Sequence, residues 1–211
     1  MATPVAVLDA NVLYPARLRD LLVRLAIAGQ YHARWTERIL DECFDSLTRD
    51  RPDLSAEHLA RTRRLMSIAM PDAEVRGYEH LVDRLDLPDP DDRHVLATAL
   101  ASGAGLIVTA NGADFPAART TPHGIVVRSP DEFVLQLTRT DVDAVVSVVV
   151  QQAAALRHPP MTPAEVLDGL EAVGVRRAAA VLRSAGIGAE PNLGAAAPST
   201  DGPPDSEGGA R

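Results

Sequence analysis

Oxygen-bearing side chains stand where predicted strands end and in or at the start of predicted helices. One group follows the apolar run 5–8, and another follows the apolar run 106–108. Carboxylate, amide and hydroxyl oxygens are hard ligands that favour Mg²⁺ or Mn²⁺ over softer metals. Such a set is typical of metal-assisted hydrolysis. The candidate residues are Asp9, Asn11, Glu42, Asp92, Thr109, Asn111 and Asp114.

Alternating strand and helix signals predict a parallel sheet covered by helices, which is an α/β fold. The carboxyl ends of parallel strands lie at one edge of a sheet, and ligand sites of open α/β sheets are found at that edge. The residues after the first and third strands are therefore expected to meet. The predicted strands cover residues 5–8, 31–35, 106–109 and 125–128.

Proline and capping residues place the other two acids on helices. Asp89 fits an N-cap and Pro90 the first helical position, so Asp92 falls in the first helical turn. Glu42 lies within a helix predicted over residues 37–49. Both acids are thereby fixed on regular elements rather than on loops.

Four segments taken together resemble the PIN domain, and most closely the VapC-type toxin ribonucleases of bacterial toxin and antitoxin pairs. An Asp-x-Asn pair after a strand is common, whereas the order and spacing of all four segments are specific. The resemblance implies a three-layer α/β/α sandwich with a mostly parallel sheet over residues 1–137. A small all-helical extension is expected over residues 138–187, and a disordered tail over residues 188–211. The four segments are residues 8–13, 39–42, 91–97 and 108–115.

The resemblance also implies an activity and partners. It implies a Mg²⁺-dependent endoribonuclease, with Mn²⁺ as a possible substitute, that acts as the toxin of a type II toxin-antitoxin pair. RNA would be the substrate and a cognate antitoxin the protein partner, and homodimers are common in the family. Asp9 and Asp92 would be the central metal ligands, Glu42 and Asp114 would complete the set, and Asn11 would orient Asp9.

One position departs from the family pattern. Many members carry Thr-x-Asp after the third strand, whereas this chain has Thr109-x-Asn111 and leaves Asp114 as the nearest charged side chain. By resemblance, Thr109 and Asn111 could hold a water molecule or a phosphate oxygen. The departure leaves open an alternative function, a catalytically inactive PIN-like module that only binds RNA or a protein.

Each candidate residue also has an ordinary structural interpretation. Asp91 and Asp92 suit the positive end of a helix dipole, and Asp9 with Asn11 could form an Asx-turn. Asp9 after a first strand also suggests a haloacid dehalogenase phosphatase. That class needs a second aspartate at the position of Asn11 and a lysine near the site, but the chain contains no lysine.

Three further features have competing explanations. Asp41 is a rival to Glu42, because adjacent helix positions point about 100° apart. His94 is favoured as a partner of local polar groups over a catalytic base. The arginines at 61, 63 and 64 are favoured as a solvated face over an RNA or antitoxin contact.

Composition narrows the class of protein. The formal net charge of -8 argues at first against a nucleic-acid substrate. Part of this charge lies in the tail, which weakens the objection, and every basic residue other than histidine is arginine. The single cysteine, Cys43, allows no disulfide within the chain, which fits a reducing compartment. No apolar stretch reaches the length of about 20 residues that spans a bilayer. We therefore expect a cytoplasmic protein without a membrane partner.

Overall fold

A four-stranded parallel sheet forms the centre of the fold. The structure is a computed structural model, and it describes residues 3–187. The strand order is β2-β1-β3-β4, and every neighbouring pair is parallel. Because the strand order reverses direction at β1, a topological switch point lies between the carboxyl ends of β1 and β3. The strands are β1 (Val5–Leu8), β2 (His32–Arg34), β3 (Leu106–Val108) and β4 (Val126–Arg128).

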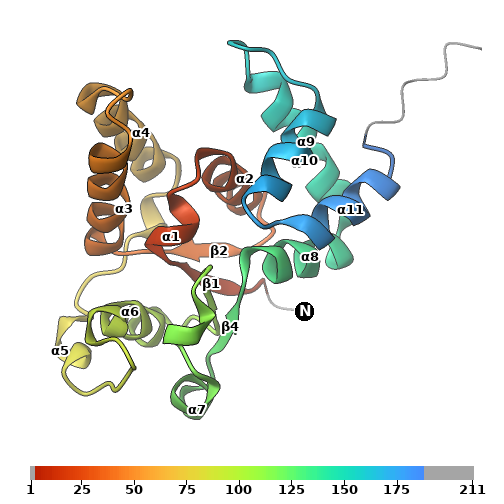
Figure 1. Cartoon of the computed structure of the whole chain (residues 1–211). Coiled ribbons are helices and arrows are strands. Elements are labelled where there is room, and N and C mark those ends of the chain that lie inside the picture. The colour runs from red at the N-terminus through yellow and green to blue at the C-terminus, as the bar shows by residue number, and fades with distance from the viewer. Residues whose placement is uncertain (1–2, 188–211) are drawn as a thin grey trace, which may run out of the picture.

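Helices cover both faces of this sheet, which confirms the expected three-layer α/β/α arrangement (Figure 1). One face carries α1 (Ala10–Leu13) and α2 (Ala16–Ile27), and the other carries α6 (Arg93–Ser102) and α7 (Ala117–Thr120). The remaining helices of this region are α3 (Glu37–Asp50), α4 (Ala56–Ala69) and α5 (Glu79–Val82). Short 3₁₀ turns are η1 (Pro71–Ala73), η2 (Pro90–Asp92), η3 (Gly112–Asp114) and η4 (Thr121–His123).

Within the described residues, the regular elements after β4 are all helices, and α9 and α10 are joined by a loop with the isolated bridge Arg157–Pro160. α8 packs against α9 and α11, and α9 also packs against α2 of the sheet region. Ser129 with Glu132, and Thr162 with Glu165, form the two predicted capping boxes. The predicted boundary at residue 137 falls inside α8 and stays a prediction; the tail 188–211 lies outside the described residues. These helices are α8 (Pro130–Thr140), α9 (Val142–Ala155), α10 (Pro163–Ala172) and α11 (Arg176–Ser184).

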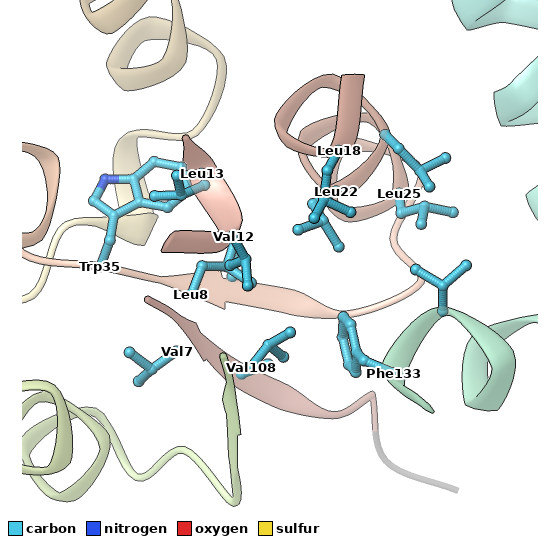
Figure 2. Packing of buried hydrophobic residues seen from close by; sticks show 14 of the residues in the cluster. Val7, Leu8, Val12, Leu13, Leu18, Leu22, Leu25, Trp35, Val108 and Phe133 are labelled. Carbon is cyan, nitrogen blue, oxygen red and sulfur yellow. The ribbon is translucent and has the colours of Figure 1, made fainter. Parts of the chain in front are cut away.

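Aliphatic side chains on both faces of the sheet hold the layers together. Figure 2 shows Leu8 on the side of α1 and α2, and Val7 on the side of α6. The rings of Tyr31 and Phe133 meet edge to face, with centroids 4.8 Å apart. This pair packs the start of α8 against the sheet region. The sheet edge that carries the candidate residues is thus supported from both sides.

The structure differs from the sequence-based expectation at two places. The helix predicted from Pro90 is divided into η2 and α6, because Asp89 caps only the first turn by accepting a 2.9 Å hydrogen bond from the Asp91 backbone N–H. The second strand is shorter than predicted, and Trp35 instead forms a single bridge to Glu74. Within the described residues, no helix has the length and apolar character needed to cross a membrane.

Candidate active site

A buried hydrogen-bond network joins the ends of β1 and β3. Asp9 is only 6% exposed, and its Oδ2 accepts hydrogen bonds from Asn11 Nδ2 at 2.6 Å and Thr109 Oγ1 at 2.7 Å. Asn11 Nδ2 also donates to Thr109 Oγ1 at 2.9 Å, and Asn11 Oδ1 accepts from the Ala110 backbone N–H at 2.9 Å. Asp9 Oδ1 accepts from the Ala10 N–H at 2.7 Å. Asn11 therefore holds the Asp9 carboxylate by a direct hydrogen bond.

The Asp9 network locks together residues that are about 100 positions apart in the chain. The strand pairing places Leu8 beside Val108, so the next residues of both strands, Asp9 and Thr109, share the switch point. Burial raises the pKa of Asp9, while hydrogen bonds from Thr109 and the Ala10 N–H oppose that rise. An Asx-turn, in which the side-chain oxygen accepts from the backbone N–H two residues on, does not account for these bonds, because Ala10 is the next residue and Asn11 donates through its side chain. The contacts with Thr109 go beyond such a turn.

Asp92 is a half-buried carboxylate at the junction of η2 and α6. Its side chain makes no capping hydrogen bond, unlike that of Asp89. Burial, followed by repulsion from the carboxylates of Asp9 and Asp114, raises the pKa of Asp92 to about 6. A helix-capping role would lower this pKa rather than raise it. The position of Asp92 thus favours a site residue over a structural cap.

Glu42 faces the same site from α3 but is held by two basic groups. His94 Nε2 lies 3.1 Å and Arg38 Nε 3.0 Å from Glu42 Oε1. Burial alone would raise the pKa of Glu42, but the hydrogen bonds from His94 and Arg38 outweigh burial and hold that pKa below its ordinary value. Glu42 is close enough to Asp9 to influence its pKa. A negative charge at Glu42 is therefore already balanced by protein groups.

Asp114 and Asn111 form the fourth part of the site, after β3. Asn111 Nδ2 donates to Asp114 Oδ2, and the Asn111 backbone N–H donates to Thr109 Oγ1 at 3.0 Å. Asp114 is near enough to raise the pKa of Asp92. Asn111 therefore orients Asp114 rather than replacing it as a charge. The amide and the acid are thus joined by a hydrogen bond.

The structure decides two of the open alternatives and adds one partner that the sequence analysis missed. Asp41 forms an ion pair with Arg63 Nη1 at 2.6 Å, so Asp41 points toward α4 and Glu42 is the side chain that faces Asp9. His94 is a partner of the polar group Glu42, as expected. Arg38 was not singled out, although its spacing of four residues from Glu42 on one helix could have revealed the pair.

The donor set fits a hard divalent cation. Within residues 3–187, no three His, Cys, Asp or Glu side chains lie together as a ready-made metal cage. Mg²⁺, however, is commonly held by one or two carboxylates together with water and substrate phosphates. Asp9 and Asp92 repel each other across the switch point, with Asp114 adding to the repulsion, and a cation would remove that repulsion. The assignment of these residues as ligands stays a prediction.

Comparison with known proteins agrees with the fold. A family model described as "PIN domain" matches residues 5–113, and one described as "VapC50 C-terminal domain" matches residues 130–184. The chain is 35% identical over 94 residues, or 44% of its length, to the Mycobacterium tuberculosis protein named "Putative ribonuclease VapC50".

The match covers 55% of that relative, so this chain spans about half of its length. No solved structure matches the chain significantly. The PIN model alone covers more than half of the 211 residues. The protein therefore belongs to the PIN domain family and carries a VapC-type helical extension on its C-terminal side.

Proposed function

We propose that this protein is a metal-dependent endoribonuclease that hydrolyses RNA phosphodiester bonds as the toxin of a type II toxin-antitoxin pair. The observation that carries the proposal is Asp92. Its carboxylate makes no capping hydrogen bond, and burial, followed by the negative charges of Asp9 and Asp114, raises its pKa at the switch point of a parallel sheet. Such grouped charge is unfavourable without a cation, and the oxygen donors suit Mg²⁺ or Mn²⁺.

Phosphodiester hydrolysis requires an activated water and a stabilised leaving oxygen. Bound divalent ions supply both by lowering the pKa of water and by neutralising developing negative charge. In this chain, Asp9 and Asp92 would hold the cation, and Asp114 would complete the set or accept a proton from a nearby water. Thr109 and Asn11 keep the Asp9 carboxylate in place through hydrogen bonds of 2.7 and 2.6 Å. Glu42, balanced by Arg38 and His94, would act from the edge of the site.

The substrate and partners are proposed partly from the comparisons. The relative named "Putative ribonuclease VapC50" supports RNA as the substrate, and the VapC-type extension supports a cognate antitoxin as the protein partner. We further propose a cytoplasmic location, where RNA and antitoxin would be met. The buried thiol of Cys43 suits a reducing compartment. A homodimer, as in many PIN proteins, is part of the same proposal.

The test is cleavage of a labelled single-stranded RNA by the full chain. Mg²⁺ or Mn²⁺ should support cleavage and a chelator should abolish it, while Asp92→Asn should remove most of the activity. Asp91→Asn is the matched control, because the neighbouring Asp91 side chain is 93% exposed and lies at the margin of the site.

Equal cleavage by wild type and Asp92→Asn, with contaminating nuclease excluded, would refute the assigned site. RNA binding without cleavage under every divalent ion would favour the alternative, a catalytically inactive binding module.

A further inference from the structure

We propose that the groove along α8, between the end of β4 and α11, binds the phosphodiester backbone of the RNA on which the site acts. This inference rests on the proposed ribonuclease function and adds a role for the C-terminal extension. The groove has a volume of about 490 Å³ and is lined by Arg128, Arg139 and Arg177, with Glu132 as its one acid. We refer to it as the α8 groove.

The α8 groove begins at the sheet edge that carries the candidate active site. Arg128 ends β4 in register with Val108 of β3, and its backbone carbonyl accepts a 3.0 Å hydrogen bond from the Thr109 N–H. Adjacent strands lie about 4.8 Å apart, so Arg128 stands one strand away from the Asp9 network. A polynucleotide leaving the site on this side would meet Arg128 first.

The groove then follows one face of α8 away from the site. Glu132, Gln136 and Arg139 lie on the same face of α8, because positions three, four and seven apart share a helix face. The seven residue steps from Glu132 to Arg139 span about 10 Å of helix. α11 contributes Arg177 to the groove. The lining therefore combines the sheet region with the extension.

The charges of the groove suit an anion. Arg128 donates only a 3.3 Å hydrogen bond to the Val127 carbonyl, and within the described residues Arg139 forms no ion pair. Arg177 is partly balanced by Asp131 at 2.7 Å and by Glu132 at 3.7 Å. The lining thus has three guanidinium groups and one carboxylate, while the buried Asp131 pairs with Arg177 from outside the lining. Arginine pairs well with phosphate through its planar fork of donors.

Another cavity beside the site has the opposite charge. It measures about 330 Å³ and is lined by Asn11, Glu42 and Asp50 but by no arginine. This cavity offers phosphate no arginine of its own, and the chain as a whole is acidic. The position of Arg139 in the last turn of α8 also complements the helix dipole. That local role predicts no dependence of RNA affinity on Arg139, which makes the two explanations separable.

The experiment measures binding of a fluorescent single-stranded RNA to the full chain in chelator, as a function of salt concentration. Removing one arginine that neutralises a phosphate should lower the slope of log affinity against log salt by about 0.7 for a single strand. Arg128→Gln and Arg139→Gln should each show this decrease together with weaker binding. Arg176→Gln, an exposed position of α11 that does not line the groove, should match wild type.

The outcomes separate this inference from the proposed function. If Arg128→Gln and Arg139→Gln show the same salt slope as wild type, the proposed RNA-binding role of the groove is overturned, whether or not the protein cleaves RNA. Lowered slopes without Mg²⁺-dependent cleavage by wild type would support the groove and contradict the nuclease. No measurable binding of RNA by wild type in chelator would overturn the groove, and the separate cleavage assay with Mg²⁺ would still decide the nuclease. Equal melting temperatures of all variants verify that the fold is intact.

Discussion

The surroundings of carboxylates shift their pKa values in opposite directions in the sheet region and in the C-terminal helices. At the sheet edge, burial and neighbouring acids raise the pKa of Asp92 to about 6, and burial raises that of Asp9. In the extension, capping hydrogen bonds lower the pKa values of Glu132 and Glu165. The first arrangement opposes ionisation and the second favours it. Function is therefore to be sought at the sheet edge, where charge is held at a cost to stability.

Most acids of the described helical region are paired with basic groups or backbone N–H groups. Asp131 accepts from Arg177 Nε at 2.7 Å and from the Ala178 N–H at 2.9 Å, which ties the start of α11 to α8. Arg183 bridges Asp168 and Glu171 between α10 and α11. The difference between the two regions predicts that substitutions should separate activity from stability.

The largest effect is expected for Asp9→Asn. The variant keeps the size of the side chain but replaces one of its two accepting oxygens with an NH₂ donor. It also loses the charge that would hold a cation, and metal stabilisation is worth several kcal/mol. RNA cleavage should fall by about 10²- to 10³-fold, while the far-ultraviolet circular dichroism spectrum stays that of wild type. Activity within tenfold of wild type would show that Asp9 has a structural role only.

A smaller effect is expected for Asp131→Ala, and it should fall on stability rather than on activity. It leaves the buried Ala178 N–H without its acceptor, which should lower the free energy of unfolding by about 1–3 kcal/mol. Cleavage per folded molecule should be unchanged, because Asp131 lies outside the Asp9 network. Urea denaturation measures the change, with the exposed Asp143→Ala in α9 as the control. Loss of activity without loss of stability in Asp131→Ala would contradict the contrast between the sheet region and the helical region.

Asp92→Asn should stabilise the metal-free protein, in contrast to Asp131→Ala. The folded-state pKa of about 6 lies above the ordinary value of 3.8, so the folded state holds the proton more tightly. The stability that this tighter proton binding by Asp92 contributes is fully present below about pH 4 and is lost as the pH rises through 6. In chelator, the variant should melt above wild type at pH 7.5 and match it at pH 4. A lower melting temperature at pH 7.5 would mean that the Asp92 carboxylate supports the fold.

The smallest effect distinguishes the two residues after β3. Asp114→Ala removes a charge from the site, whereas Asn111→Ala removes only the amide that orients it. The Mg²⁺ concentration for half-maximal cleavage should rise more for Asp114→Ala than for Asn111→Ala. The reverse order would place the functional oxygen on Asn111.

Local signals were enough to predict much of the fold. Ser129 with Glu132 and Thr162 with Glu165 marked their helices, because a capping box is contained within four residues. The apolar run ending at Leu8 marked the central strand in the same way. Short strands and η2 were less well placed, since tertiary pairing decides where they end.

The environment of the site depended on contacts between distant segments. The spacing of Asp9 and Asn11 suggested their hydrogen bond, but the raised pKa of Asp92 arises from burial and from acids brought in by other strands. The contact between Glu42 and His94 joins α3 to α6 and carries no sequence signal. The link of Asp131 to Arg177 spans 46 residues and is equally invisible in local patterns.

Calorimetric titration of Mn²⁺ into the metal-free full chain tests the central claim most directly. Wild type and the exposed control Asp91→Asn should bind Mn²⁺ with the same affinity, and Asp92→Asn should bind it at least about tenfold more weakly, a difference of about 1.4 kcal/mol. Equal Mn²⁺ affinity of all three proteins, or no binding by wild type, would contradict a metal site at the switch point between β1 and β3.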